Sequence, residues 1–453
     1  MISTPSGSSF CKKRVVSNHL VQGTPILDRL FRNLTCPPSS FQGLLNDRAV
    51  KEIGLPVVNM AKGIKRVHEQ EPNVQSVAPK RTKNCQLDGP NNRQRSCIGL
   101  PDNHDDAATS SLPPSASLPL SIGPAEGDDM SHEMWLYFMS NHQSEEQYHK
   151  KLRLRDAVYS IMKGVFPYCG LYMVGSSMSG FGGLHSDLDL CLMLSHRLID
   201  QKKEAPEILG IIHAALRKCN FIKKLTLIKA KVPILKFEDQ IANVECDLNV
   251  NNWVGIRNTH LLAAYARLDW RLRPLVIYIK YWARFHDIND ARKMTISSYS
   301  LTLLLIHYLQ CGAEPPVMPS LQKLAPSKFN CDTDIRTLTL SDALPNYNCT
   351  NNASLGELFL GFLKYYSETF DFDRYAISVR LGMKVPKDMV MGIEIPPRTQ
   401  WKHICIEEPY DKSNTARSVY DEYTFHRIKR VFNASYQRLR RTRNLSSLFE
   451  TPF

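Results

Sequence analysis

Two aspartates one residue apart, Asp187 and Asp189, stand in the otherwise apolar stretch DLDLCLML. Alternate side chains of a β-strand point to the same face, so the two carboxylates would lie side by side. Like charges at that separation repel each other unless a cation lies between them. Mg²⁺ takes hard oxygen ligands and is commonly held by one or two carboxylates plus substrate phosphates. The pattern therefore predicts a site for Mg²⁺, with Mn²⁺ as an alternative.

A third carboxylate and a Gly-Ser pair accompany these aspartates. Asp247 alternates with apolar residues in VECDLNV, and Gly175 and Ser176 follow the apolar run GLYMV. A Gly-Ser turn offers backbone N–H groups and a hydroxyl to phosphates. A lone Asp-x-Asp is a weak sign, because most such pairs are solvated carboxylates. Three carboxylates opposite a Gly-Ser turn predict a two-metal phosphoryl-transfer centre, in which Asp187, Asp189 and Asp247 are both catalytic and metal-binding.

Composition narrows the class of protein. The 453 residues suffice for two or three domains, and 57 Lys and Arg against 44 Asp and Glu give a net charge of +13. Such a charge favours a polyanionic partner such as RNA, although a generic basic protein would show it equally. The 12 cysteines form no C-x-x-C pair, which argues against a zinc site and for a reducing, intracellular compartment.

No apolar run of membrane-spanning length and no secretory leader is apparent, so we expect no membrane association. Cytoplasmic localisation is the corresponding expectation. Short basic clusters, Lys65-Arg66 and Lys80-Arg81, leave nuclear import open as an addition.

Aromatic and proline content divides the chain. Residues 1–125 hold only three of its 41 aromatic residues but 13 of its 27 prolines, so we expect an N-terminal region that stays disordered. After it, hydrophobic periodicity predicts helices over 145–165 and 205–219 around strands at 170–175, 187–194, 231–237 and 243–250. The chain then becomes mainly helical, with helices over 258–270, 272–286, 297–310, 354–368 and 422–440.

The aspartate pattern resembles that of the DNA polymerase β-like nucleotidyltransferases. Longer stretches, VECDLNVNNWVGIRNTHLL, RPLVIYIKYWARFHDIND, SSYSLTLLLIHYLQ and IEEPYDKSNTAR, resemble the terminal nucleotidyltransferase branch, and among its members the cytoplasmic poly(A) RNA polymerases of the germline-development type. The resemblance covers roughly residues 130–435.

It implies an α+β fold, which follows the N-terminal region over 1–125 that composition predicts to be disordered. The expected parts of the fold are a linker and a helix packing on the second domain (126–144), a nucleotidyltransferase catalytic domain (145–256), a helical, poly(A)-polymerase-associated domain (257–437) and a basic C-terminal tail (438–453).

The resemblance also assigns nucleotide contacts outside the carboxylates. Lys280 and Arg284 lie four apart on one predicted helix face and are expected to meet the β- and γ-phosphates. Ser298 and Tyr299 match a phosphate-binding serine and a base-stacking tyrosine. Asn258 and Thr259 match residues that contact the ribose hydroxyls. A second role open to this pair is an N-cap for the following helix.

The loop 406–417 resembles the nucleotide-recognition motif of this branch and contributes Glu408, Asp411 and Asn414. Uridylyl-specific relatives carry a histidine at the position aligned with Asn414. An asparagine there favours adenine, with modest discrimination because few contacts differ.

The expected activity is therefore the template-independent transfer of AMP from ATP to RNA 3′ ends. A terminal uridylyltransferase, an inert scaffold of the same fold and a small-molecule nucleotidyltransferase are the alternatives. No RNA-recognition motif, KH or zinc-finger pattern accompanies the catalytic pattern. A separate RNA-binding protein is therefore expected to recruit a monomeric catalytic subunit to its RNA.

Overall fold

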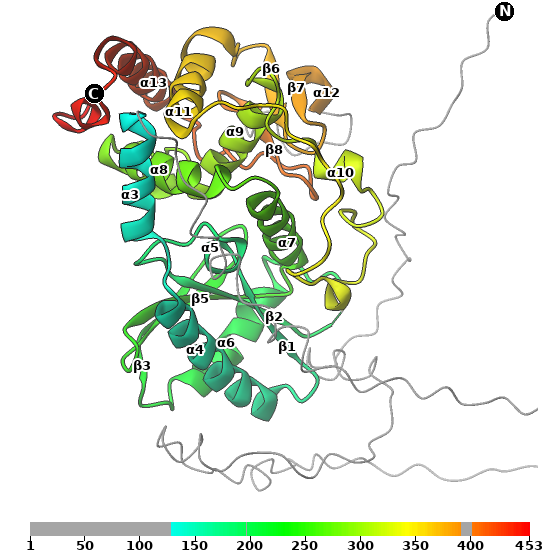
Figure 1. The fold of residues 1–453 in the computed structure, drawn as a ribbon. Helices are drawn as coiled ribbons and strands as arrows, with labels where there is room; N and C mark the ends of the chain where they lie inside the picture. Colours follow the sequence, from blue (N-terminus) through cyan, green and yellow to red (C-terminus); the bar gives the residue numbers. More distant parts are fainter. Residues whose placement is uncertain (1–127, 196, 391–400) are drawn as a thin grey trace, which may run out of the picture. The chain divides into compact units, whose positions relative to one another are not determined.

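The predicted aspartates lie on a mixed five-stranded sheet with the strand order β1-β2-β5-β4-β3 (Figure 1). The computed structural model describes residues 128–195, 197–390 and 401–453. Only β2 and β5 run parallel, and the other neighbouring pairs are antiparallel. The strands of this sheet are β1 (Gly170–Val174), β2 (Leu188–Met193), β3 (Ile222–Ile228), β4 (Ile234–Asp239) and β5 (Val244–Val250).

Helices cover this sheet. One pair, α4 (Glu145–Val165) and α6 (Glu204–Leu216), packs together against it, while α5 (Ser176–Ser179) and α7 (Trp253–Leu268) pack against β1 and β2 (Figure 1). The start of α4 is fixed by a capping box, in which the Ser144 hydroxyl and the Gln147 side chain bond each other's backbone N–H groups. The sheet with its covering helices forms the catalytic half of the described chain.

The second half is mainly helical, with a core built around α8 (Leu272–Phe285), in which Trp282 is fully buried. The preceding helix α3 (Asp129–Asn141) packs on α8, as the resemblance implied. The indole Nε1 of Trp282 donates to Ser435 Oγ at 3.0 Å. The other helices of this half are α9 (Ser298–Cys311), α10 (Leu321–Leu324), α11 (Leu355–Lys364), α12 (Lys387–Val390) and α13 (Glu422–Thr442).

A small three-stranded sheet in this half was not predicted. Its order is β7-β6-β8, from β6 (Tyr375–Ser378), β7 (Met383–Pro386) and β8 (Ile406–Glu407). Strands of two to four residues carry too little periodicity to be recognised in a sequence. Their role is to position the loop that follows β8. With both halves described, the predicted α+β fold class is confirmed.

One helix boundary differs from the prediction in a way that bears on function. Helix α7 begins at Trp253 with Asn252 as its N-cap residue, five residues earlier than predicted. Asn258 and Thr259 therefore lie inside the helix, and the N-cap role considered for them is wrong.

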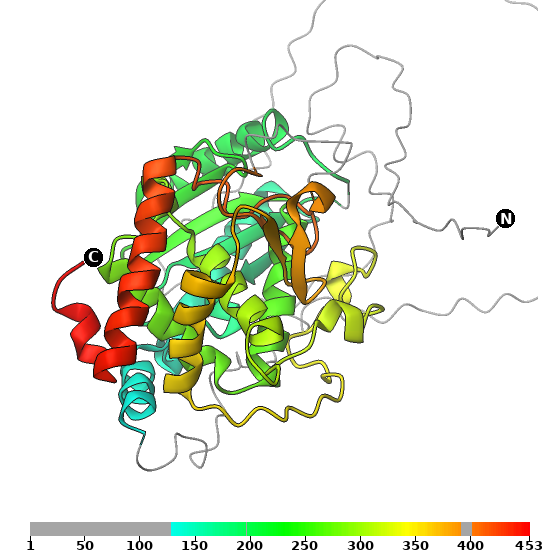
Figure 2. The same ribbon diagram turned by 90° about the horizontal axis from the view of Figure 1, so that it is seen from above.

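The end of the chain is packed rather than a separate tail. Helix α13 continues to Thr442, and a 3₁₀ turn (Leu445–Phe449) follows it. Leu445 and Leu448 are fully buried against the helical core, so the predicted basic tail over 438–453 is wrong as a structural unit. Figure 2 shows this C-terminal turn beside α3 at one side of the helical half. The apolar residues that follow the arginines, Leu445, Leu448 and Phe449, explain the packing.

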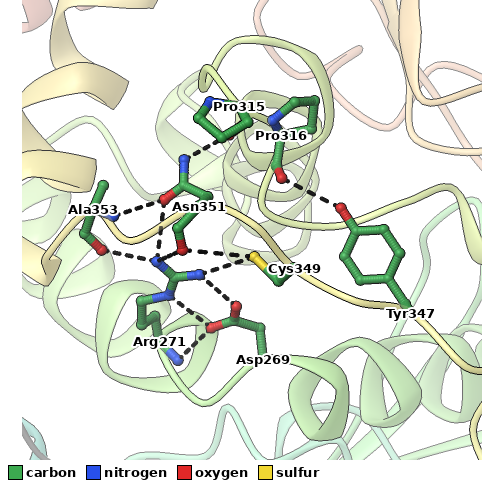
Figure 3. A network of polar contacts seen from close by, with 8 residues as sticks. All are labelled: Asp269, Arg271, Pro315, Pro316, Tyr347, Cys349, Asn351 and Ala353. Carbon is green, nitrogen blue, oxygen red and sulfur yellow. Dashed lines mark hydrogen bonds and ion pairs between the residues drawn. The ribbon is translucent and has the colours of Figure 1, made fainter.

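A polar network ties the α7–α8 junction to the long segment between α10 and α11 (Figure 3). The Arg271 guanidinium pairs with Asp269 at 2.7 Å and donates to the backbone carbonyls of Asn351 and Ala353 at 3.0 and 2.8 Å. Arg271 and Asp269 are both buried. This segment has little regular structure, and the buried guanidinium gives it several fixed hydrogen bonds.

Within the described residues, all eight cysteines are free and no helix has the length and apolar character needed to cross a membrane. The predicted disorder of residues 1–125 and the two basic clusters lie outside the described residues.

Candidate active site

Strand register brings two of the three predicted aspartates side by side. Asp189 on β2 pairs with Asp247 on the parallel neighbour β5. Asp187 is the residue directly before β2 rather than its first residue, because the strand begins at Leu188. The pairing of β2 with β5 could not be read from the sequence, since the two strands are more than fifty residues apart.

A cation already lies at this carboxylate cluster. Lys236 on β4 pairs in register with Asp247, so its side chain emerges on the same face. Its Nζ lies 3.4 Å from Asp187 Oδ2, 3.5 Å from Asp247 Oδ1 and 2.6 Å from Glu245 Oε2. Sequence analysis did not single out Lys236. The signal was present as one lysine between buried Leu235 and Phe237, but the register was needed to place it.

Burial and mutual repulsion shift the pKa values of these carboxyls. Burial, then the charges of Asp247 and Asp187, raises the pKa of Asp189 to about 7, against the opposing influence of Lys151 and Lys236. Burial also raises the pKa of Asp247, although Lys236 counteracts the shift. Clustered carboxyls whose charged forms are disfavoured are typical of a site that receives a metal ion.

The donor set fits Mg²⁺ or Mn²⁺. Asp247 Oδ1 is buried and faces the Lys236 ammonium at 3.5 Å, so a cation already lies where a metal ion would bind. Among the described residues, no group of three His, Cys, Asp or Glu side chains is arranged so that it could hold a metal ion by itself. An open set of carboxylates is nevertheless what Mg²⁺ uses when substrate phosphates supply further ligands.

The Gly-Ser turn lies against the aspartates. Gly175 has a positive φ of 75°, and a Cβ there would collide with the Asp189 carboxylate, so only glycine fits. Its N–H donates to Thr259 Oγ1 at 2.8 Å, and Thr259 in turn donates to the Gly255 carbonyl. Ser176 opens the short helix α5. In this structure Thr259 thus supports the turn, while its predicted ribose contact stays a prediction.

The two predicted phosphate-binding cations emerge from α8. Lys280 Nζ donates to the Phe181 carbonyl at 2.9 Å, in the loop between α5 and β2. Burial, with repulsion from Arg284, lowers the pKa of Lys280 to about 8, while Asp189 acts in the opposite direction. Arg284 itself is exposed. The structure therefore bonds Lys280 to the loop after α5, while Arg284 lies at the surface.

Three of the predicted base and ribose contacts meet on the helical side. Tyr299 OH donates to Glu408 Oε1 at 3.2 Å, and a side-chain hydrogen bond from Asn258 to Glu408 helps to stabilise the carboxylate. Asn258 Oδ1 is buried without a hydrogen-bond partner. Burial and the neighbouring Asp411 raise the pKa of Glu408. A ring, a carboxyl and an amide from three separate elements thus converge.

Asp411 also faces the catalytic half. Its Oδ2 lies 3.6 Å from Lys231 Nζ, which donates to Ser413 Oγ at 3.1 Å. Lys231 belongs to the β3–β4 connection, so this contact joins the sheet to the loop after β8. The other predicted phosphate contact, Ser298 Oγ, donates to Asn289 Oδ1 at 3.1 Å.

Asn414 is bonded to the backbone of its own loop in this structure, and the base-selecting role predicted for it stays a prediction. It is 1% exposed, and its Oδ1 accepts from the N–H groups of Ile406 and Ala416, at 3.0 and 2.9 Å. Its Nδ2 donates to the Ile404 carbonyl at 3.0 Å. The amide closes the loop onto β8. A family alignment could not distinguish this bracing role from a base contact.

Comparison with known proteins agrees with this geometry. Residues 130–267 match a family model described as "Poly(A) RNA polymerase, mitochondrial-like, central palm domain", and residues 354–414 match one described as "Cid1 family poly A polymerase". The fold is similar to a solved structure of a GLD-2/RNP-8 complex, with a TM-score of 0.65 and 42% identity over 72% of this chain and 98% of that chain.

Two relatives illustrate the sequence similarity. Poly(A) RNA polymerase gld-2 homolog A of Drosophila melanogaster is 46% identical over 328 residues, which are 71% of this chain but 24% of the relative. Poly(A) RNA polymerase GLD2 of Mus musculus is 42% identical over 352 residues, which are 74% of this chain and 71% of the relative. The chain thus spans about a quarter of the fly protein, and a larger part of the mouse protein. On these similarities, and on its fold, the chain belongs to the GLD2 family of poly(A) RNA polymerases.

Proposed function

We propose that this chain is an RNA 3′-adenylyltransferase that transfers AMP from ATP to the 3′ end of RNA without a template. The observation that carries the proposal is the register pairing of Asp189 with Asp247 beside the Gly-Ser turn. At Gly175 of this turn any side chain would collide with the Asp189 carboxylate. Membership in the GLD2 family supports adenylyl transfer over the other nucleotidyltransferase reactions.

Asp187, Asp189 and Asp247 would hold divalent metal, with Mg²⁺ expected and Mn²⁺ as an alternative. When bound, the metal supplies charge neutralisation of the triphosphate and activation of the attacking hydroxyl. The protein's own residues do the positioning. The Gly175–Ser176 turn and Lys280 receive the phosphates, while Thr259 fixes the turn through its hydrogen bond to Gly175.

On the helical side, Tyr299 supplies a ring on which the base stacks, and Asn258 and Glu408 lie where polar groups of the nucleoside would meet them. Stacking on a ring tolerates any base and contributes about 1–3 kcal/mol. Preference for adenine must therefore come from polar contacts. Because Asn414 is engaged with the backbone, Glu408 is the better candidate for that selection.

We further propose that the chain works as the catalytic subunit beside a separate RNA-binding protein. A relative has been solved as a GLD-2/RNP-8 complex, which supports assembly with a second protein. Recruitment would raise the local concentration of the RNA 3′ end at the catalytic site. We place this activity in the cytoplasm, as the family resemblance implies.

The test is extension of an oligo(A) RNA by the full chain with each nucleoside triphosphate supplied alone. We expect extension with ATP, and loss to background in Asp189→Asn. Asp373→Asn, an exposed aspartate in the turn before β6, is the matched control and should retain full activity. Preferred use of UTP would overturn adenylyl transfer and favour the uridylyltransferase alternative. No extension with any nucleotide, even on RNA tethered to the protein, would favour an inert scaffold.

A further inference from the structure

One buried lysine in the catalytic half has no place in the function proposed so far. Lys151 lies on α4, which packs on β1, and its side chain is buried with only 3% exposed. Its Nζ donates to three side-chain oxygens: Gln143 Oε1 at 2.7 Å, Ser177 Oγ at 2.8 Å and Ser186 Oγ at 2.9 Å. An ammonium group has three N–H donors, so this set uses all of them.

The three acceptors come from three different segments. Gln143 belongs to the α3–α4 linker, Ser177 to the Gly-Ser turn, and Ser186 to the loop directly before Asp187. Two of the three acceptors are themselves bonded to another segment, while the Ser186 hydroxyl donates to Gly183 in its own loop. Ser177 Oγ donates to the Asp187 carbonyl at 3.1 Å, and Gln143 Nε2 donates to the Ser177 carbonyl at 3.1 Å. The ammonium therefore lies at the centre of a closed hydrogen-bond network.

A purely structural lysine would be a poor choice at this place. All three acceptors are neutral, so no contacting carboxylate compensates for the burial of the charge, and the ammonium is costly to keep at this place. The nearest charges that favour the ammonium are Asp189 and Asp187, beyond contact distance, while burial lowers its pKa to about 8. Retaining a charged group here points to a role at the catalytic site.

We propose that Lys151 is a positioning residue that fixes the Gly175–Ser177 turn, which receives the phosphates, relative to Asp187, which holds metal. This inference rests on the proposed function, because it concerns the same phosphoryl-transfer site. Because Lys151 is buried and its three N–H groups are all used, it has no free donor for a nucleotide or RNA. It acts through its hydrogen bonds to Ser177 and Ser186. These bonds set the distance between the phosphate-binding turn and Asp187.

The expected consequence is a defect in kcat. A misplacement of about 1 Å between reacting groups can cost about 100-fold in rate, so Lys151→Met should lower kcat by about 10- to 100-fold. The KM for RNA should stay within about twofold of the wild-type value, because no RNA contact is removed.

Lys387→Met is the matched control. Lys387 is also a buried lysine, whose Nζ donates to the carbonyls of Lys402 and His403 at 2.7 and 3.2 Å, but these lie in the helical half. Both variants should lower the melting temperature. Only Lys151→Met should lower kcat and speed hydrogen–deuterium exchange in the segment 175–187 of the nucleotide-free protein.

Ser186→Ala provides a second variant that removes one acceptor and leaves the lysine in place. It should lower kcat by a smaller factor, and its effect should shrink when it is added to Lys151→Met, because both changes break one network. If Lys151→Met does not fold, the kcat and the exchange rate of Ser186→Ala decide the question.

The outcomes separate this inference from the proposed function. A wild-type protein that extends RNA, together with a Lys151→Met variant whose kcat stays within twofold or whose 175–187 exchange is unchanged, would overturn the positioning role alone. Absence of extension by the wild type would overturn the proposed function, whereas the exchange measurement would still report whether Lys151 orders the turn.

Discussion

Asp189 is the residue at which burial, neighbouring charge and metal binding compete most directly. Burial and the charges of Asp247 and Asp187 raise its pKa to about 7. In the unfolded chain the same carboxyl titrates near the ordinary value of 3.8. Over the interval between these two values, the folded protein retains a proton that the unfolded chain has already released.

Proton linkage fixes the direction in which the free energy of unfolding changes with pH over this interval. Where the folded state binds more protons than the unfolded state, the free energy of unfolding decreases as pH rises. The metal-free protein should therefore lose stability from about pH 4 to about pH 7, and the contribution of Asp189 should level off above that range. Denaturant unfolding in the presence of a chelator measures this dependence.

Asp189→Asn is the informative variant, because it removes the titrating group and keeps the shape. Its stability should depend less steeply on pH over the same interval, with the residual slope due to other groups of raised pKa such as Asp247 and Glu408. Equal slopes in the two proteins would show that Asp189 is already ionised in the folded state. Added Mg²⁺ should stabilise the wild type more at higher pH, where no proton has to be displaced.

At the scale of elements, long segments with a regular hydrophobic period could be predicted from the sequence. Short strands, and the pairing of strands in the sheet, could not. The predicted helix over 145–165 coincides with α4, because its capping residues and apolar face are both local signals. Strand β3, with exposed lysines and only half-buried apolar residues, was missed. The aspartates were identified from the sequence, whereas Lys236 and Lys151 were not, because their roles depend on strand register and on contacts between distant segments.

The segment between α10 and α11 shows how an irregular element is held in place. One of its attachments is the buried Arg271–Asp269 pair, which bonds the carbonyls of Asn351 and Ala353 (Figure 3). Removing one member of a buried ion pair leaves the other charge uncompensated, which costs about 3–5 kcal/mol. Arg271→Met should therefore lower the free energy of unfolding by about that amount, as measured by denaturant unfolding.

The control is an ion pair of the same types in an exposed place. Arg336 and Asp334 lie 2.5 Å apart, with side chains 49% and 36% exposed. Arg336→Met should cost only about 0–1 kcal/mol, since exposed pairs contribute little. A cost of less than about 1 kcal/mol for Arg271→Met as well would mean that other contacts, such as the hydrogen bond from Tyr347 to the Pro316 carbonyl, suffice to hold the segment.

At the scale of the whole molecule, the net charge and the residues of the candidate site are expected to act on different substrates. The net charge of +13 belongs to the entire chain, whereas the proposed nucleotide contacts lie on a few defined elements. Attraction between a basic protein and a polyanion is long-range and screened by salt. Contacts that are partly buried, such as those of Lys280, are screened less.

This division predicts different salt responses for the two substrates. For single-stranded nucleic acid, each neutralised phosphate contributes about −0.7 to the slope of log affinity against log salt concentration. The KM for free oligo(A) RNA should therefore rise steeply with salt, while the KM for ATP should change much less. Steady-state extension assays over a salt series, with each substrate varied in turn, measure both.

Tethering the RNA to the protein provides the decisive comparison. A tether replaces electrostatic capture by a high local concentration, so extension of tethered RNA should be nearly independent of salt and faster than that of free RNA. Equal salt dependence for free and tethered RNA would mean that salt acts on the catalytic site itself. In that case the basic charge would serve the chemistry rather than capture, and a recruiting RNA-binding protein would have little to contribute. The expected result, a salt-sensitive KM that a tether abolishes, is the behaviour of a catalytic subunit that depends on a partner to hold its RNA.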